Sequence, residues 1–338
     1  MPTVDAEVLA QLPKAELHVH VEGTLEPELA FELAGRNHVE LPVGSVEELR
    51  ALYDFENLQS FLDLYYACTA VLRHRDDFAA LATAYLEKAA AQGVRHVELF
   101  FDAQAHTTRG VPVDTVIDGF LDAFGGAQRR WGISGGLILC FLRHLPAEEA
   151  LATLESVAHR AGDLLGVGLD STEVGNPPSR FAEAYALARE LGLHAVAHAG
   201  EEAPPSYIEE ALDVLRVERV DHGLTCVQDP ALVRRLADEQ VPLTMCPLSN
   251  VRLRAVGSLE EHPAVRLLEA GVRVTVNSDD PSYFGGYITE NFVAVANTFD
   301  LDADQVAALA ANGVTASFAS AERQRELLDE ISAWRRNF

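Results

Sequence analysis

The stretch AELHVHVEG, residues 15–23, reads as a buried β-strand that carries two histidines. Because strand side chains alternate between faces, His18 and His20 point to the same side. Two neighbouring imidazoles buried without partners would be unfavourable. An isolated pair of this kind is more often structural, since histidine is frequently part-buried. The rest of the chain therefore decides whether the pair binds something.

Seven further apolar runs bounded by turn residues follow this stretch. They are VRHVELFFD (94–102), SGGLILCFLR (134–143), LLGVGLDSTE (164–173), HAVAHAGEE (194–202), RVDHGLT (219–225), VPLTMCPLSN (241–250) and VRVTVNSDDP (272–281). Stretches with helical spacing lie between them, for example 75–93, 146–162 and 178–192. This alternation predicts a single (β/α)₈ TIM barrel over residues 1–338, with extra helices after the first strand and at the C-terminus. A doubly wound open sheet is the alternative, but no G-x-G-x-x-G or G-x-x-x-x-G-K-[ST] loop supports it.

Polar residues gather at or just past the C-terminal ends of the predicted strands. They are His198, Glu201, Asp221, His222, Ser249, Asn250, Asp279 and Asp280. In a barrel these ends converge on one mouth, so residues far apart in the chain share a single site. Ser249 and Asn250 are typical of side chains that hold loop backbone, and Asp280 before Pro281 is also typical of a helix cap.

The first connection, residues 24–93, is much longer than a usual crossover. Within it, Leu58, Phe61, Leu62 and Tyr65 recur at helical spacing, which we interpret as core packing. A lid over the active site is the alternative interpretation of this connection.

Three imidazoles and one carboxylate, from His18, His20, His198 and Asp279, suit a zinc ion with an open position for water. His222 is a fifth candidate, so spacing alone leaves one histidine spare. Neither of the two lysines, Lys14 and Lys88, lies in the second to eighth strands, where it would bridge two metals. We therefore expect one zinc per chain. The spare histidine would serve the activated water, and Glu201 would pass a proton to the substrate.

The composition argues against some classes of binding partner. The net charge of −26, from 52 acids and 26 bases, argues against nucleic acids and anionic membranes. The N-terminal residues 1–16 lack the basic start and apolar core of a secretory signal, which favours a cytoplasmic protein. Four dispersed cysteines without C-x-x-C indicate no disulfide framework. No pattern predicts the oligomeric state, so a homo-oligomer stays open.

Five motifs in this order resemble the adenosine and adenine deaminases of the amidohydrolase superfamily. They are HVHVEGTLEPE (18–28), HAGEE (198–202), DHG (221–223), CPLSN (246–250) and NSDDP (277–281). The resemblance covers nearly the whole chain and implies a metal-dependent hydrolase barrel. It implies a zinc on His18, His20, His198 and Asp279, with Glu201 protonating the purine ring as hydroxide attacks C6. His222 would position the hydroxide and Asp280 would bind the imidazole-ring edge of the purine.

Three features resemble the adenine branch. Glu22 stands where adenosine deaminases have an aspartate that contacts the sugar, so it is a candidate substrate-binding residue. Glu173 stands near a glycine of those enzymes, and YFGGY (283–287) follows NSDDP. Our hypothesis is that Glu173 accepts the N9 hydrogen of free adenine, which adenosine lacks. We thus expect hydrolysis of adenine to hypoxanthine and ammonia in purine salvage. Adenosine or an N6-substituted adenine is the alternative substrate, and a catalytically idle metal-binding barrel is the alternative of another class.

Overall fold

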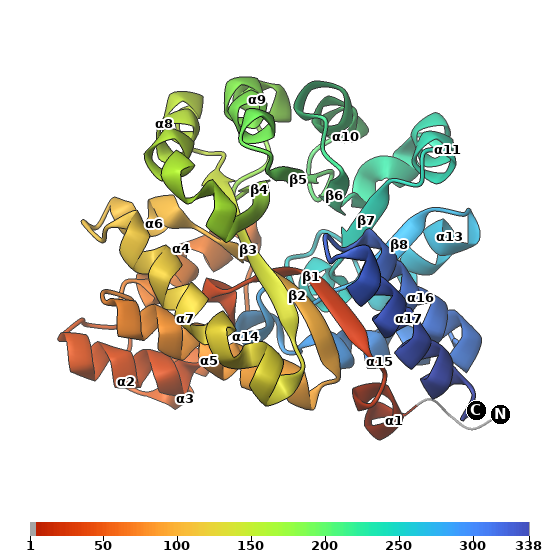
Figure 1. Cartoon of the computed structure of the whole chain (residues 1–338), viewed down its shortest axis with the longest axis horizontal. Coiled ribbons are helices and arrows are strands. Elements are labelled where there is room, and N and C mark those ends of the chain that lie inside the picture. Colours follow the sequence, from red (N-terminus) through yellow and green to blue (C-terminus); the bar gives the residue numbers. More distant parts are fainter. Residues whose placement is uncertain (1–4, 338) are drawn as a thin grey trace.

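The computed structural model describes residues 5–337 and shows eight parallel strands in the order β1 to β8 (Figure 1). The strands are β1 Lys14–His20, β2 Val94–Phe101, β3 Ser134–Leu142, β4 Leu164–Asp170, β5 His194–Ala199, β6 Arg219–His222, β7 Pro242–Met245 and β8 Arg273–Val276. A parallel bridge between Val19 and Asp279 joins the last strand region to the first. The predicted (β/α)₈ barrel is therefore confirmed. Residues 1–4 and 338 of the expected domain lie outside the described residues.

Helices surround the strands and fill the long first connection. Its helices, after the short 3-10 helix η1 Glu22–Thr24, are α2 Pro27–Asn37, α3 Val46–Ala51, α4 Leu58–Thr69 and α5 Arg75–Ala91. The crossover helices are α6 Ala103–Thr107, α7 Val113–Trp131, α8 Ala147–Val157, α9 Ala182–Glu190, α10 Pro205–Glu210, α11 Pro230–Asp238, α12 Pro247–Arg252 and α13 Ala264–Glu269. The remaining helices are α1 Ala6–Ala10, α14 Pro281–Phe284, α15 Ile288–Thr298, α16 Ala303–Ala316 and α17 Ala321–Arg335.

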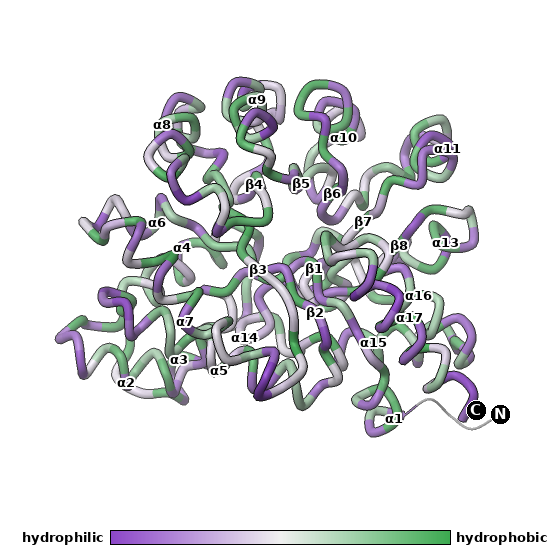
Figure 2. Tube along the Cα trace, in the orientation of Figure 1, coloured by the Kyte–Doolittle hydropathy of each residue, from purple (hydrophilic) through white to green (hydrophobic). Residues whose placement is uncertain are grey.

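The outer helices turn an apolar face inward, and hydrophobic and hydrophilic positions alternate around them (Figure 2). Helices α5 and α7 pack together closely. Gly119 of α7 makes this possible, because a Cβ there would lie 2.5 Å from the Arg75 carbonyl and 2.6 Å from Phe78 Cβ. Among the described helices, none combines the length and apolar character that crossing a bilayer requires.

The barrel interior is filled in layers that support the site. Toward the N-terminal ends of the strands, Arg219 donates to Glu98 at 2.7 Å, and Phe318 lies against the guanidinium at 4.8 Å. A buried apolar layer follows, formed by Phe100, Ile138, Cys140 and Val196. The Phe100 ring lies 5.1 Å from that of His18, so the histidines rest on this layer. The interior is thus a packed core, and the histidines of the first strand lie above it toward the C-terminal end.

Candidate active site

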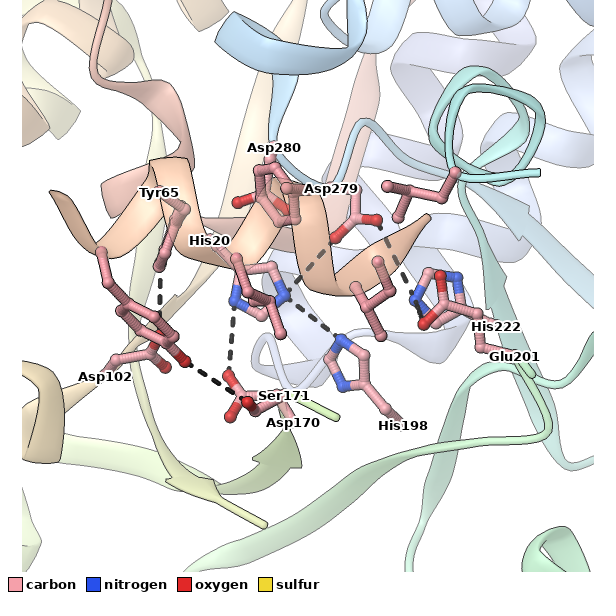
Figure 3. Close-up of a pocket in the computed structure, with 15 residues that line it drawn as sticks. His20, Tyr65, Asp102, Asp170, Ser171, His198, Glu201, His222, Asp279 and Asp280 are labelled. Atoms are coloured by element: carbon pink, nitrogen blue, oxygen red, sulfur yellow. Dashed lines mark hydrogen bonds and ion pairs between the residues drawn. The ribbon is translucent and has the colours of Figure 1, made fainter. Parts of the chain in front are cut away.

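A pocket at the C-terminal ends of the strands collects side chains from most of the barrel (Figure 3). Its ionisable lining residues are His20, Asp102, Asp170, His198, Glu201, His222, Asp279 and Asp280. They come from the ends of β1, β2, β4, β5, β6 and β8 and from the loops that follow. Strand ends thus bring together residues that are more than 250 positions apart in the sequence.

Helix α4 forms an apolar wall of this pocket. Leu58, Phe61, Leu62 and Tyr65, which we interpreted as core residues, all line it, and so does Tyr66. They are also buried, with Phe61 packed 4.7 Å from the Phe284 ring, so core and pocket wall are the same surface here. The predicted core packing is therefore confirmed, and the same side chains also form a wall of the pocket.

Four ligand-type atoms converge at the pocket floor. His20 Nε2 lies 3.2 Å from His198 Nε2, and Asp279 Oδ1 lies 3.2 Å from His18 Nε2 and 3.4 Å from His20 Nε2. Ligands of a tetrahedral zinc, at a zinc–nitrogen distance of about 2.0–2.1 Å, are separated by about 3.3 Å. Imidazole nitrogens that face one point at this spacing suit a shared cation. The donor set therefore fits the expected metal.

His18, His198, His222 and Asp279 form the one cluster of four in which all ligand atoms lie close to one another in the described chain, so proximity alone favours His222 over His20. Its contacts differ from those of His20. His222 Nε2 lies 3.6 Å from Glu201 Oε2 and 3.9 Å from Asp279 Oδ2, and its Nδ1 contacts the Asn250 amide at 3.1 Å. His222 thus faces Glu201 across the pocket, beside the four converging atoms.

Partners behind the histidines fix their ring orientation. His18 Nδ1 lies 2.9 Å from Thr244 Oγ1, and that hydroxyl donates to Asp221 at 2.6 Å. The other Asp221 oxygen lies 3.7 Å from His198 Nδ1. The Thr244 contact at Nδ1 of His18 favours the tautomer in which its Nε2 is free to bind a metal, and Asp221 places a negative charge beside both rings. Asp221, a strand-end residue in the sequence, therefore lies behind the pocket.

The CPLSN segment acts on the site through side chains. Ser249 donates to Asp279 Oδ2 at 2.5 Å, and Asn250 contacts His222. Asp279 and His222 both have left-handed backbones, with φ of 66° and 63°. Strained conformations of non-glycine residues are typical of functional sites. Ser249 and Asn250 thus position reactive side chains as well as loop backbone.

Burial and neighbouring charges shift the pKa values of the acids and histidines in the pocket. Burial, with the nearby Asp279 carboxylate, raises the pKa of Glu201 well above its usual range. Burial, assisted by His18, lowers the pKa of His222 to about 3. Burial and Asp279 likewise raise the pKa of Asp280. The site therefore favours a protonated acid at Glu201, which is the state of a proton donor, and a neutral imidazole at His222.

Of the three residues expected to bind substrate, the structure brings only Asp280 into the pocket lining. Asp280 is 4% exposed, and its Oδ1 has no hydrogen-bond partner in residues 5–337. It also lies directly against Gly23, where a Cβ would be 2.0 Å from Asp280 Oδ1. Glycine at this position therefore leaves room for the carboxyl group.

The contacts of Glu173 differ from the expected role. Its carboxylate accepts backbone N–H groups of Gly200 at 2.6 Å, Glu202 at 2.8 Å and Ala203 at 2.9 Å. These three bonds occupy both oxygens and hold the loop on which Glu201 stands. Acceptance of a substrate hydrogen by Glu173 does not fit this geometry.

Glu22 lies behind the pocket rather than in its lining. Its Oε1 contacts His106 Nε2 at 2.8 Å and accepts the Asp102 N–H at 3.2 Å. Burial raises its pKa to about 7. Asp102 and Asp170, which our sequence interpretation did not single out, stand in the pocket instead. Each is a lone acid at the end of a strand, and that position was the available signal.

Comparisons with known proteins agree with this geometry. The family model described as adenosine deaminase matches residues 13–334. An adenine deaminase of Streptomyces coelicolor is 56% identical over 331 residues, covering 97% of each chain. One of Cupriavidus necator is 54% identical over 332 residues, covering 97% of this chain and 95% of its own.

Solved structures give the same placement. A crystal structure of adenine deaminase from Arthrobacter aurescens matches with a TM-score of 0.95 at 53% identity, covering 96% of this chain and 99% of that one. An amidohydrolase from Burkholderia ambifaria with bound Zn matches with a TM-score of 0.90 at 26% identity, covering 100% of this chain and 95% of its own. The resemblance in the five motifs is thus confirmed, and the chain belongs to the adenosine deaminase family of hydrolases, within its adenine deaminase branch.

Proposed function

We propose that the protein hydrolyses free adenine to hypoxanthine and ammonia, as a step of purine salvage. The observation that carries this proposal is the convergence of His18, His20, His198 and Asp279 beside Glu201 and His222 in one buried pocket. The substrate follows from the branch, since relatives at 53–56% identity are adenine deaminases.

The three imidazole Nε2 atoms and Asp279 Oδ1 would hold one zinc ion. When bound, zinc supplies Lewis-acid activation of a water molecule near neutral pH. The bound Zn in the 26% identical amidohydrolase supports this choice of metal. His222 is left outside the ligand set, because its two nitrogens face Glu201 and Asn250.

The side chains of the site divide the proton transfers. Glu201, whose pKa is raised by burial, donates a proton to ring nitrogen N1 and makes C6 electrophilic. His222 holds the attacking water from its Nε2 side, next to Glu201, because Nδ1 accepts from the Asn250 amide and the ring proton stays on Nε2. Asp280 binds the ring at N7 through its free Oδ1. The water oxygen joins C6 and loses both of its protons. One leaves with the amino group as ammonia when the C6–N bond breaks, and the other returns to Glu201.

The first experiment compares kcat/KM for adenine and adenosine with zinc-loaded protein, following hypoxanthine, inosine and ammonia separately. We expect a strong preference for adenine. Preference for adenosine would keep the mechanism and refute the substrate. Turnover of only N6-substituted adenines would refute it in the same way.

A variant separates catalysis from metal binding. Glu201→Gln keeps the shape of the side chain and removes its acid, so kcat should fall by about 100-fold or more. Zinc content should stay near one per chain, and removal of zinc by a chelator should lower the melting temperature of both proteins, since a ligand of the native state stabilises it. Unchanged turnover in the variant would contradict the role of Glu201, and no turnover in the wild type would favour an idle barrel.

A further inference from the structure

Asp102, at the end of β2, carries an unexplained acceptor in the pocket. It is 3% exposed and lines the cavity. Its Oδ2 accepts from the Tyr65 hydroxyl at 3.3 Å, but its Oδ1 has no hydrogen-bond partner within residues 5–337. A buried carboxyl oxygen without a donor is unfavourable. The part of the pocket around Asp102, which we call the corner, is poor in hydrogen-bond donors. Glu22 Oε2 and Asp170 Oδ1 also have no partner in that range.

The proposed function fixes which edge of the purine faces this corner, and the following inference rests on it. With C6 at the converging ligands, N1 at Glu201 and N7 at Asp280, the N3–C4–N9 edge points away from all three. Asp102 and Asp170 lie across His20 from Glu201, as Figure 3 shows. His20, Asp102 and Asp170 also form one close group.

We propose that Asp102 selects the free base by accepting the hydrogen on N9 at its Oδ1. Free adenine has an N–H on this edge, whereas a nucleoside carries its sugar carbon at N9. Adenine would thus supply the N–H donor that Asp102 Oδ1 lacks. A nucleoside would leave this oxygen unpaired, and its sugar would crowd the carboxylate. Leaving a buried polar group unpaired is the strongest way for a site to reject an analogue.

Two neighbouring polar groups face partners through one atom each, and within the described chain Asp170 Oδ1 stays free like Asp102 Oδ1. Asp170 Oδ2 faces His20 Nδ1 at 3.5 Å, and Ser171 Oγ lies 2.7 Å from His144 Nδ1. A second cation on His20, Asp102 and Asp170 is the rival explanation of the free oxygens. His20 Nε2 already faces the converging ligands, so its Nδ1 keeps the ring proton and is not free to bind a metal. The geometry therefore favours a donor from the substrate.

The test uses adenine and 9-methyladenine, which lacks the N9 hydrogen, with the full-length zinc-loaded protein. We expect the wild type to prefer adenine strongly. Asp102→Ala should lower kcat/KM for adenine by about 10–100-fold, as expected for the loss of one hydrogen bond to a charged group. It should leave the value for 9-methyladenine equal or higher. Tyr66→Phe, on the same side of the pocket, is the matched control and should keep the wild-type ratio.

Two additions keep the test decisive. Asp102→Asn retains one acceptor oxygen and should keep more of the preference than Asp102→Ala, and Asp102→Ser replaces the alanine variant if that protein does not fold. Binding of hypoxanthine and 9-methylhypoxanthine, measured by calorimetry, should show the same loss of discrimination in the truncated variants.

An unchanged ratio in Asp102→Ala would overturn the inference while leaving the proposed function intact. Two metal ions in the wild type and one in Asp102→Ala would overturn it in favour of a second cation. If the wild type turned over neither purine, the proposed function would be wrong, and the ratio of the two hypoxanthine affinities would still decide the role of Asp102.

Discussion

Glu173→Gln tests whether a carboxylate outside the pocket lining controls the catalytic loop. Glu173 is 1% exposed and accepts from the backbone of Gly200, Glu202 and Ala203 at 2.6–2.9 Å. These residues bracket Glu201, the proposed proton donor. We therefore expect the substitution to disturb both the stability of the loop and the placement of that acid.

The expected loss of stability follows from the number of acceptor oxygens in each side chain. Glutamine offers one carbonyl oxygen in place of two carboxylate oxygens, and its amide N–H₂ faces a backbone N–H. At least one of the three bonds to Glu173 is lost, and a hydrogen bond to a charged group contributes about 1.5–3 kcal/mol. We expect the free energy of unfolding to fall by about 2–3 kcal/mol. For a chain of 338 residues this lowers the melting temperature by about 3–4 °C.

Activity should fall through kcat. Glu201 must lie within hydrogen-bond reach of N1, and a misplacement of about 1 Å costs about 100-fold in rate. We expect kcat for adenine to drop by about tenfold or more with a smaller change in KM, measured by ammonia release. Glu202→Gln removes the same charge from the same loop at an exposed side chain and serves as the control.

Two results would refute this reasoning. The first is a Glu173→Gln protein with wild-type kcat and melting temperature, because the loop would then not depend on the carboxylate. The second is wild-type kcat with lost discrimination between adenine and 9-methyladenine. That outcome would return Glu173 to the substrate-binding role that the sequence first suggested.

Two further predictions concern the fold and the pocket floor. Burial opposes ionisation of Glu98, but the Arg219 guanidinium and His96 outweigh it and hold its pKa at about 2. Since this folded-state pKa is below the usual value, the ionised carboxylate contributes about 3 kcal/mol above pH ~4.5 and loses it as the pH falls toward 2. The stability difference between wild type and Glu98→Gln, from urea denaturation, should therefore shrink over that range; a constant difference would contradict the assignment. Separately, Gly23→Ala places a Cβ against Asp280, so KM for adenine should rise by about tenfold with zinc content unchanged, and an unaltered KM would show that Asp280 does not bind the ring.

The architecture was predictable because buried parallel strands leave a simple signal. Each of the eight expected runs contains one observed strand, since near-continuous apolar segments bounded by turn residues have few other structures available. The four proposed metal ligands were predictable for a related reason. Strand alternation puts His18 and His20 on one face, and barrel closure brings His198 and Asp279 to the same mouth.

The rest of the site depends on contacts that periodicity does not encode. Helix α4 shows apolar helical spacing whether it covers core or forms a pocket wall, so Phe61 and Tyr65 gave no sign of the cavity. Glu173 and Asp102 both follow strand ends. Their roles differ because backbone N–H groups surround the carboxylate of Glu173 and, in the described part of the chain, leave an oxygen of Asp102 free. The loop after β5 supplies three N–H groups that Glu173 accepts, whereas Asp102 accepts the Tyr65 hydroxyl at Oδ2 and keeps Oδ1 without a partner in residues 5–337.

This difference gives a physical rule for the acids of the pocket. An acid whose oxygens are filled by backbone donors shapes the loop, and an acid with a free oxygen in the cavity is available to a ligand. By this rule Asp280 and Asp102 are the acids proposed to bind the purine, while Glu173 holds the backbone of the loop that carries Glu201. The proposed assignment of specificity therefore moves from Glu173 to Asp102, because Asp102, unlike Glu173, combines a place in the lining with an unfilled acceptor.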